Sequence, residues 1–162
     1  AFFAEFGGDY LKIFAVNASE TDVEAEHRFF GPDNQIDEFY LVVDGRVGIT
    51  HTVPSPNVKH NIADQLIGSV EMEDVVVSSV DRGEVFGWSS LLPPYATTAG
   101  ASTIVPSKVV VFDAAKLRSE MEEDPKFGFK LTQRLAQVVH GRLRDRQIEC
   151  IVGASESTQH GA

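Results

Sequence analysis

The sequence has a single cysteine, Cys150, among 162 residues and contains no long apolar run. One thiol cannot form an internal disulfide or a multi-cysteine zinc site. No segment approaches the roughly 20 consecutive apolar residues that a membrane-spanning helix requires. The first ten residues include Glu5 and Asp9 but no basic stretch, so they do not resemble a signal peptide. We therefore expect no membrane partner and a cytoplasmic location.

Patterns typical of metal binding and nucleophilic catalysis are also missing. The sequence has five histidines: His27, His51, His60, His140 and His160. None forms the His-x-His pair that a cupin metal site would use together with a nearby carboxylate. Ser89 and Ser90 do not lie in a Gly-x-Ser-x-Gly motif, and there is no Gly-Lys-Ser or Gly-Lys-Thr phosphate loop. We expect no catalytic or metal-binding residues and no enzyme activity; a cupin-type enzyme ranks last among the alternatives.

Positive charge is scarce and unevenly distributed. The chain has 14 basic and 24 acidic residues, for a formal net charge of −10. Residues from Lys126 onward carry +3, so the first 125 residues carry −13. Because contacts to nucleic-acid phosphates need a cationic surface, we expect no direct DNA binding.

The middle of the chain has the pattern of a β protein. Between residues 21 and 112, short runs rich in β-branched and aromatic residues alternate with Gly, Pro, Asn and Asp. The clearest predicted strands are 39–43, 46–53, 75–80, 101–104 and 109–112. Asp44-Gly45 predicts a two-residue hairpin between the first two, and residues 31–34 (Gly-Pro-Asp-Asn) predict a turn. So many short strands favour an antiparallel β jelly roll.

Helical patterns flank this region. Residues 1–20 place Phe3, Phe6, Tyr10 and Phe14 at steps of three or four, which predicts a helical segment that Gly7-Gly8 weakens. Residues 113–153 predict two helices. Asp113 is positioned to cap the first, 114–122, and Asp124-Pro125 begins the second. Residues 154–162 are predicted to form a flexible tail. The predicted fold class is mainly β with flanking helices: a jelly roll at 21–112 and a long C-terminal helix.

The long helix carries an apolar stripe interrupted by a soft spot at Gly141. Its members are Leu131, Leu135, Val138 and Leu143. The stripe is expected to face the jelly roll or a second copy of the chain. It is longer than one small barrel needs, so we favour a homodimer formed through this helix.

Residues 83–99 form the most informative segment. A strand is expected to end at Gly83, Gly87 allows a close backbone approach, and a one-turn helix is expected near residues 88–90. Free amides at such a turn, with nearby hydroxyl groups, suit a phosphate. The candidate ligand-binding residues are Gly83, Glu84, Phe86, Gly87, Trp88, Ser89, Ser90, Leu91, Thr97, Thr98 and Ala99.

These residues resemble the cyclic nucleotide-binding domain family, which includes the effector domains of catabolite-activator-like proteins. Gly83-Glu84-x-Phe86-Gly87 is similar to the start of the family's phosphate-binding cassette. Residues 39–47 resemble its early glycine-turn strand pair, and 109–113 its last strand. The resemblance implies a jelly roll with flanking helices, a regulatory or sensor function, and cAMP or cGMP as ligand, with no required cofactor. It also implies that the last helix serves in dimerisation or switching.

Two cassette positions depart from the family pattern. The family has an acidic residue that binds the ribose hydroxyl where this chain has Trp88, and a phosphate-binding arginine where it has Thr97. No Lys or Arg occurs between Arg82 and Lys108. A missing charge-assisted hydrogen bond typically costs roughly 1.5–3 kcal/mol. The resemblance therefore implies weakened binding of cAMP or cGMP in the usual pose.

Three interpretations of the cassette remain open. It could bind a cyclic nucleotide weakly, with Arg82 or a partner residue as the cation. It could bind another small molecule against the aromatic surfaces of Trp88 and Tyr95. It could also be a degenerate site in which Trp88 is core packing, leaving a dimerisation or interaction module.

Family members that bind DNA carry a further domain after the long helix. About nine residues follow Gly153 here, which is too few for such a domain, so we expect none in this sequence.

Overall fold

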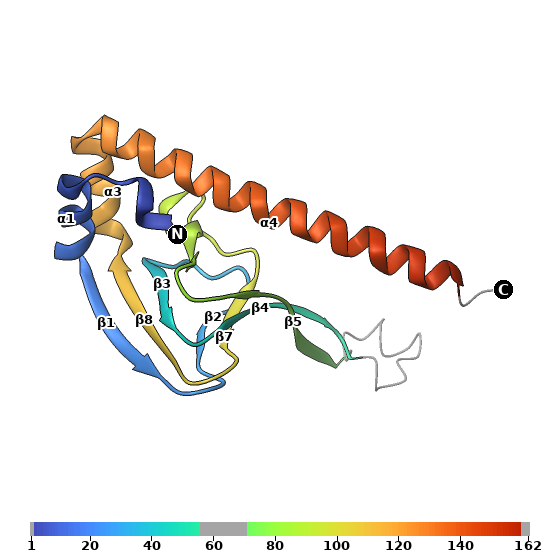
Figure 1. Cartoon of the computed structure of the whole chain (residues 1–162). Helices are drawn as coiled ribbons and strands as arrows, with labels where there is room; N and C mark the ends of the chain where they lie inside the picture. Colours follow the sequence, from blue (N-terminus) through green and yellow to red (C-terminus); the bar gives the residue numbers. More distant parts are fainter. Residues whose placement is uncertain (1, 56–70, 160–162) are drawn as a thin grey trace. The chain divides into compact units, whose positions relative to one another are not determined.

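The computed structural model describes residues 2–55 and 71–159, and its main feature is a pair of four-stranded antiparallel sheets (Figure 1). The first sheet has the strand order β1-β8-β3-β6 and the second β2-β7-β4-β5. The strands are β1 (Ala18–Val23), β2 (Arg28–Phe30), β3 (Glu38–Asp44), β4 (Val47–Pro54), β5 (Met72–Val80), β6 (Val85–Phe86), β7 (Gly100–Thr103) and β8 (Ser107–Asp113). This arrangement confirms the predicted β jelly-roll fold with flanking helices.

The core lies between the two sheets. Its buried cluster takes members from both: Tyr40, Val42, Phe86 and Val109 from the first, and Phe30, Val47, Val80 and Ala101 from the second. Burial alternates over Tyr40–Val43 in β3 and over Ser107–Val110 in β8, as expected when one face of a strand packs inward, whereas Phe39 and Tyr40 are both buried. Each fully buried aliphatic or aromatic side chain contributes about 1.5–3 kcal/mol, so this shared cluster holds the sheets together.

The N-terminal segment contains η1 (Phe2–Glu5) and α1 (Gly8–Val16), separated by Phe6 and Gly7. Its aromatic side chains pack on one another and on the first sheet. The Phe3 ring lies 4.8 Å from that of Phe14 and 5.6 Å from that of Phe112. The helical part stops at Val16, and β1 begins at Ala18 rather than after residue 20. The sequence of β1 hid this strand because it is an edge strand whose residues are mostly exposed and polar.

The predicted hairpin at Asp44-Gly45 is wrong. β3 pairs with β6 and β8, whereas β4 pairs with β5 and β7, so the chain crosses from one sheet to the other at this turn. Gly45 does have the positive φ that the motif indicated, +88°. A Cβ there would also lie 2.8 Å from the Pro106 carbonyl oxygen. The glycine is needed for a corner between sheets, which has the same local signal as a hairpin.

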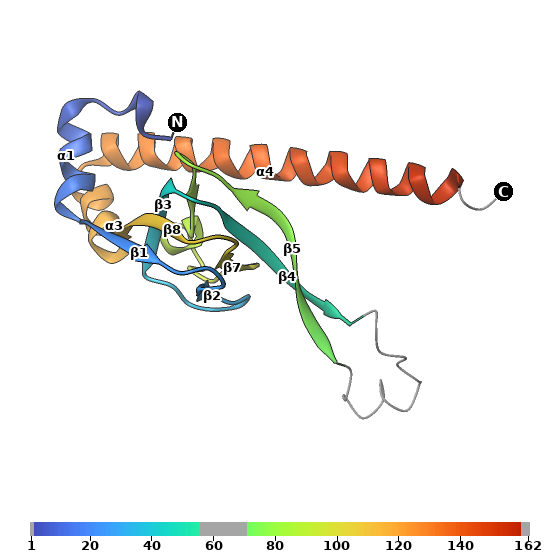
Figure 2. The same cartoon turned by 60° about the horizontal axis from the view of Figure 1, so that its bottom comes forward.

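Figure 2 shows β4 and β5 as a long ribbon that runs out beyond the other strands of the second sheet. Their register runs from Val47 opposite Val80 to Pro54 opposite Met72. His60 lies outside the described residues, as do 160–162, part of the predicted tail.

The C-terminal helices are α3 (Ala114–Glu123) and α4 (Pro125–Gln159). Both predicted caps are present. The Asp113 carboxylate accepts a hydrogen bond from the Lys116 amide at 3.0 Å, and the Asp124 carboxylate accepts one from the Phe127 amide at 3.2 Å. α4 passes through Gly141 and continues to Gln159, beyond the expected end at Gly153. Adding residues such as Ala, Glu and Gln to an existing helix is favourable, whereas starting one is not.

The chain divides into two units after Arg118. The first contains both sheets and the start of α3, and the second contains the rest of α3 and α4. In the second unit, Phe127, Leu131 and Leu135 are buried, while Leu143 is 56% exposed. No helix in the described part of the chain is long and apolar enough to cross a membrane.

Candidate functional site

The cassette begins with a tight turn between β5 and β6. β5 ends at Val80, so the expected strand end at Gly83 is wrong; Gly83 instead has φ +84° within the turn. The Glu84 carboxylate accepts a hydrogen bond from the Asp81 amide at 2.8 Å, and the Glu84 amide donates to the Asp81 carbonyl at 3.0 Å. Glu84 therefore closes this turn with its own side chain.

Position 87 requires a glycine for two reasons. Its φ is +73°, a conformation that costs an L-residue roughly 1–2 kcal/mol. A Cβ at this position would lie 2.8 Å from the Tyr40 ring and 3.1 Å from the Glu38 carbonyl oxygen. The close backbone approach predicted for this glycine is confirmed.

The short helix predicted after Gly87 is present as η2 (Trp88–Leu91). Ser90 is fully buried, and its hydroxyl donates to the Gly87 carbonyl at 2.7 Å. This bond uses the only proton of the hydroxyl, so Ser90 has no proton left to donate to a phosphate. Trp88 and Ser89 are half-buried, and Leu91 is buried.

Thr97 occupies the position that the resemblance assigns to the phosphate-binding arginine, and its side chain is 97% buried in the loop at residues 31–34. The hydroxyl donates to the Gly31 carbonyl at 2.6 Å and accepts from the Asn34 amide at 3.0 Å. Two backbone bonds join the same segments, from the Asp33 amide to the Thr97 carbonyl and from the Thr97 amide to the Asn34 carbonyl. Thr97 thus holds the end of the cassette to a distant turn.

The other predicted site residues lie in different surroundings. Phe86 belongs to the core and stacks on Tyr40 with ring centroids 4.6 Å apart. Thr98 is exposed and Ala99 is half-buried.

Burial and a hydrogen bond to Glu38 raise the pKa of the Tyr40 phenol, which keeps the phenol neutral. The backbone of residues 83–91 forms the turn and short helix that the sequence predicts. The hydroxyls of Ser90 and Thr97, however, donate to backbone carbonyls of the protein.

Arg118 is a cassette contact that the sequence did not reveal. From the fifth residue of α3, its guanidinium donates one hydrogen bond to the Ser90 carbonyl and another to the Asp37 carboxylate at 3.1 Å. It also lies over the Tyr95 ring, 4.7 Å from the centroid. The absence of a cation within the cassette indicates that one could come from another part of the chain. No local sequence pattern identifies Arg118 as that residue, because it lies far along the chain.

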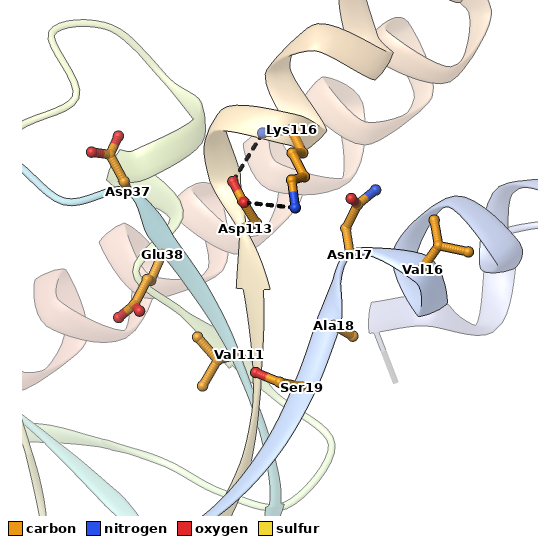
Figure 3. Close-up of a pocket in the computed structure, with 9 residues that line it drawn as sticks. All are labelled: Val16, Asn17, Ala18, Ser19, Asp37, Glu38, Val111, Asp113 and Lys116. Atoms are coloured by element: carbon orange, nitrogen blue, oxygen red, sulfur yellow. Dashed lines mark hydrogen bonds and ion pairs between the residues drawn. The ribbon is translucent and has the colours of Figure 1, made fainter.

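A separate open pocket of about 460 Å³ lies where the α1–β1 junction meets the starts of β3 and α3. Its polar lining includes Asn17, Asp37, Glu38, Asp113 and Lys116 (Figure 3). Lys116 pairs with Asp113, with the ammonium nitrogen 3.4 Å from the carboxylate. None of the predicted ligand-binding residues lines this pocket. Within the residues that the structure describes, no three His, Cys, Asp or Glu side chains gather in a way that could hold a metal ion.

The fold is shared with solved cyclic nucleotide-binding proteins. No protein-family profile and no curated relative matches the chain. A Geobacter metallireducens GS-15 protein, described as a cyclic nucleotide-binding protein, is 27% identical with a TM-score of 0.69; the match covers 88% of this chain and 91% of that one. A cyclic nucleotide-binding domain from Methylobacillus flagellatus KT is 17% identical with a TM-score of 0.67, covering 88% and 71%.

The match to the Catabolite Activator Protein of Thermus thermophilus is 15% identical with a TM-score of 0.63. It covers 93% of this chain and 62% of that protein. These similarities agree with the jelly roll and the long C-terminal helix. The resemblance found in the sequence is thus confirmed: the chain has the fold of the cyclic nucleotide-binding domain.

Proposed function

We propose that this chain is a non-enzymatic regulatory module of the cyclic nucleotide-binding type whose cassette does not hold cAMP or cGMP in the usual pose. The observation that carries the proposal is the bonding of Thr97. Its hydroxyl is buried against Gly31 and Asn34, at the position where the family pattern has its phosphate-binding arginine. Ser90 is bonded to Gly87 in the same way. A phosphodiester would therefore meet neither the expected cation nor two of the expected hydroxyl donors.

Isothermal titration of the full chain with cAMP and with cGMP tests this proposal. We expect no saturable binding up to about 1 mM, which corresponds to a binding free energy weaker than about −4 kcal/mol. The single tryptophan, Trp88, lies in the cassette and gives an independent fluorescence readout. A micromolar dissociation constant for either nucleotide in the unaltered chain would overturn the proposal.

The double variant Trp88→Glu, Thr97→Arg measures what the two departures cost. If they account for the lost affinity, it should gain cAMP binding while Trp88→Glu, Thr97→Val gains none. Thermal melting of both variants checks that each remains folded, because Thr97 also joins the cassette to the 31–34 loop. A folded double variant without affinity would show that other cassette residues also prevent binding.

The proposal includes a homodimer formed through the outer part of α4. Leu131 and Leu135 are already buried within one chain, but Leu143 and Ile148 are 56% and 50% exposed. We expect light scattering to give a mass near 35 kDa, twice the 17.7 kDa of one chain. Leu143→Glu should shift it to the monomer, whereas Leu143→Met, which keeps an apolar side chain of similar size at that position, should not. A monomeric mass for the unaltered chain would contradict the proposed homodimer.

The cytoplasmic location stays a prediction.

A further inference from the structure

Arg118 contacts three parts of the molecule with one side chain. One nitrogen donates to the Ser90 carbonyl in η2, a second donates to the Asp37 carboxylate ahead of β3, and the plane covers Tyr95. The side chain is 24% exposed, against 80% for Asp37. A guanidinium suits this place because its planar fork directs donors to two acceptors while its flat face stacks on an aromatic ring, and a lysine has no such planar group.

The groups that Arg118 contacts are ones that the cassette leaves unsatisfied or strained. The last carbonyls of a short helix have no partner within it, and Ser90 supplies one of them to Arg118. Tyr95 has φ +62°, an unfavourable conformation for a residue with a side chain, so it needs tertiary contacts to hold it. The Tyr95 amide donates to the Leu92 carbonyl at 2.9 Å, and the guanidinium covers the ring.

The place of Arg118 along α3 gives these contacts their consequence. The boundary between the two units falls directly after it, although α3 continues as one helix to Glu123. The start of that helix is held by the Asp113 cap, by the buried side chains of Ala114 and Leu117, and by a bond from the Ala114 amide to the Asp37 carbonyl at 2.9 Å. It is also held by the Arg118 cluster, by which we mean Arg118, Ser90, Tyr95 and Asp37. The cap depends only on neighbours in sequence. The Arg118 cluster depends on the shape of the cassette.

We propose that Arg118 is the positioning residue that couples the conformation of the cassette to α3. The inference rests on the proposed regulatory function, since it identifies how that site would act on the C-terminal helices. A change in η2 or Tyr95 removes the acceptor or the stacking surface of the guanidinium. The first turns of α3 then lose the side-chain contact that ties them to the cassette.

Amide hydrogen exchange on the full chain without ligand gives the first test. In Arg118→Gln we expect the amides of Leu92 and Tyr95 to exchange about tenfold faster, with a shift in Trp88 emission. Lys116→Gln removes the same charge from the same helix, where Lys116 pairs only with Asp113 in the described contacts, and should leave both readouts unchanged. Equal exchange in the two variants would overturn the proposal. If Arg118→Gln does not fold, Asp37→Asn removes the exposed partner alone and should give a smaller change in the same amides.

A double-mutant cycle separates coupling from simple stabilisation. Ser90→Ala removes the bond to the Gly87 carbonyl inside the cassette. In the presence of Arg118 we expect it to speed exchange at residues 119–123 about threefold, and to have no such effect in the Arg118→Gln background. Additive effects would overturn the coupling. Since no nucleotide is used, this result is independent of the titration that tests the proposed function.

Discussion

The two halves of the cassette are held in different ways. In residues 83–91 the side-chain hydrogen bonds go to near neighbours, from the Asp81 amide to Glu84 and from Ser90 to Gly87, while the backbone of this half pairs with β3. Residues 92–99 depend on partners far away in the chain, with Thr97 bonded to the 31–34 loop and Tyr95 covered by Arg118. The first half contains the Gly83-Glu84-x-Phe86-Gly87 motif that resembles the family's, with Trp88 as a departure from it. The half with distant bonds contains Thr97, the position to which the resemblance assigns the family's arginine.

This difference indicates which half depends on the rest of the fold. A tight turn with a positive-φ glycine has few alternative conformations, so the 83–87 turn is constrained locally. The second half has a conformation that depends on its partners, because Thr97 is bonded to the 31–34 loop. The comparison can be tested by changing one residue in each half.

The largest effect is expected from Gly87→Ala in the first half. The alanine would have an unfavourable φ and a Cβ 2.8 Å from the Tyr40 ring. We expect a loss of about 3 kcal/mol in the free energy of unfolding, or roughly 10 °C in melting temperature. Gly83→Ala is the matched control, because φ there is +84° but nothing lies within 4 Å of a Cβ. Similar losses in both variants would show that the Tyr40 contact is unimportant.

A smaller effect is expected from Thr97→Val in the second half. The valine leaves the Asn34 amide without its hydroxyl acceptor and the Gly31 carbonyl without its donor, at a cost of about 1–3 kcal/mol by urea unfolding. Thr98→Val, one residue on and exposed, should change stability by less than about 0.5 kcal/mol. If Thr97→Val were as harmless as Thr98→Val, the second half would not depend on the 31–34 loop.

The smallest effect is expected at the start of α3. There the Asp113 carboxylate caps the helix by a bond to a near neighbour, as the side-chain bonds of residues 83–91 do. Hydrogen bonds from the Lys116 amide and side chain lower the pKa of Asp113 below its usual range. A folded-state pKa below the unfolded one means that the group stabilises the protein above the unfolded pKa, and that this is lost as the pH falls through the folded pKa. Asp113→Ala should cost about 1 kcal/mol at pH 7 and less in acid.

The matched variant Asp113→Asn retains an oxygen acceptor but has no charge to titrate. Its stability at pH 7 should stay close to that of the unaltered chain, and the part of the acid dependence that comes from Asp113 should disappear. Urea unfolding at pH 7 and at pH 3 measures both variants. An unchanged acid dependence in Asp113→Asn would show that Asp113 contributes nothing to it.

Much of the fold could be predicted from residue patterns with local causes. The caps at Asp113 and Asp124, the turn at 31–34 and the one-turn helix after Gly87 each involve residues within a few positions of one another. Strand β1 was missed because an exposed edge strand lacks hydrophobic alternation. The Asp44-Gly45 hairpin was wrong because a positive-φ glycine at a corner between sheets gives the same signal.

The sequence by itself determined the class of fold and the absence of Lys and Arg between Arg82 and Lys108, and it predicted the position of the cassette. These follow from composition, spacing and short-range hydrogen bonds. Only the tertiary structure decided that Thr97 is bonded to the 31–34 loop and that Arg118 reaches Ser90 and Tyr95. The physical reason is distance along the chain: 66 residues separate Thr97 from Gly31, and 28 separate Arg118 from Ser90. Contacts of that length depend on how the sheets bring the segments together, which no local pattern records.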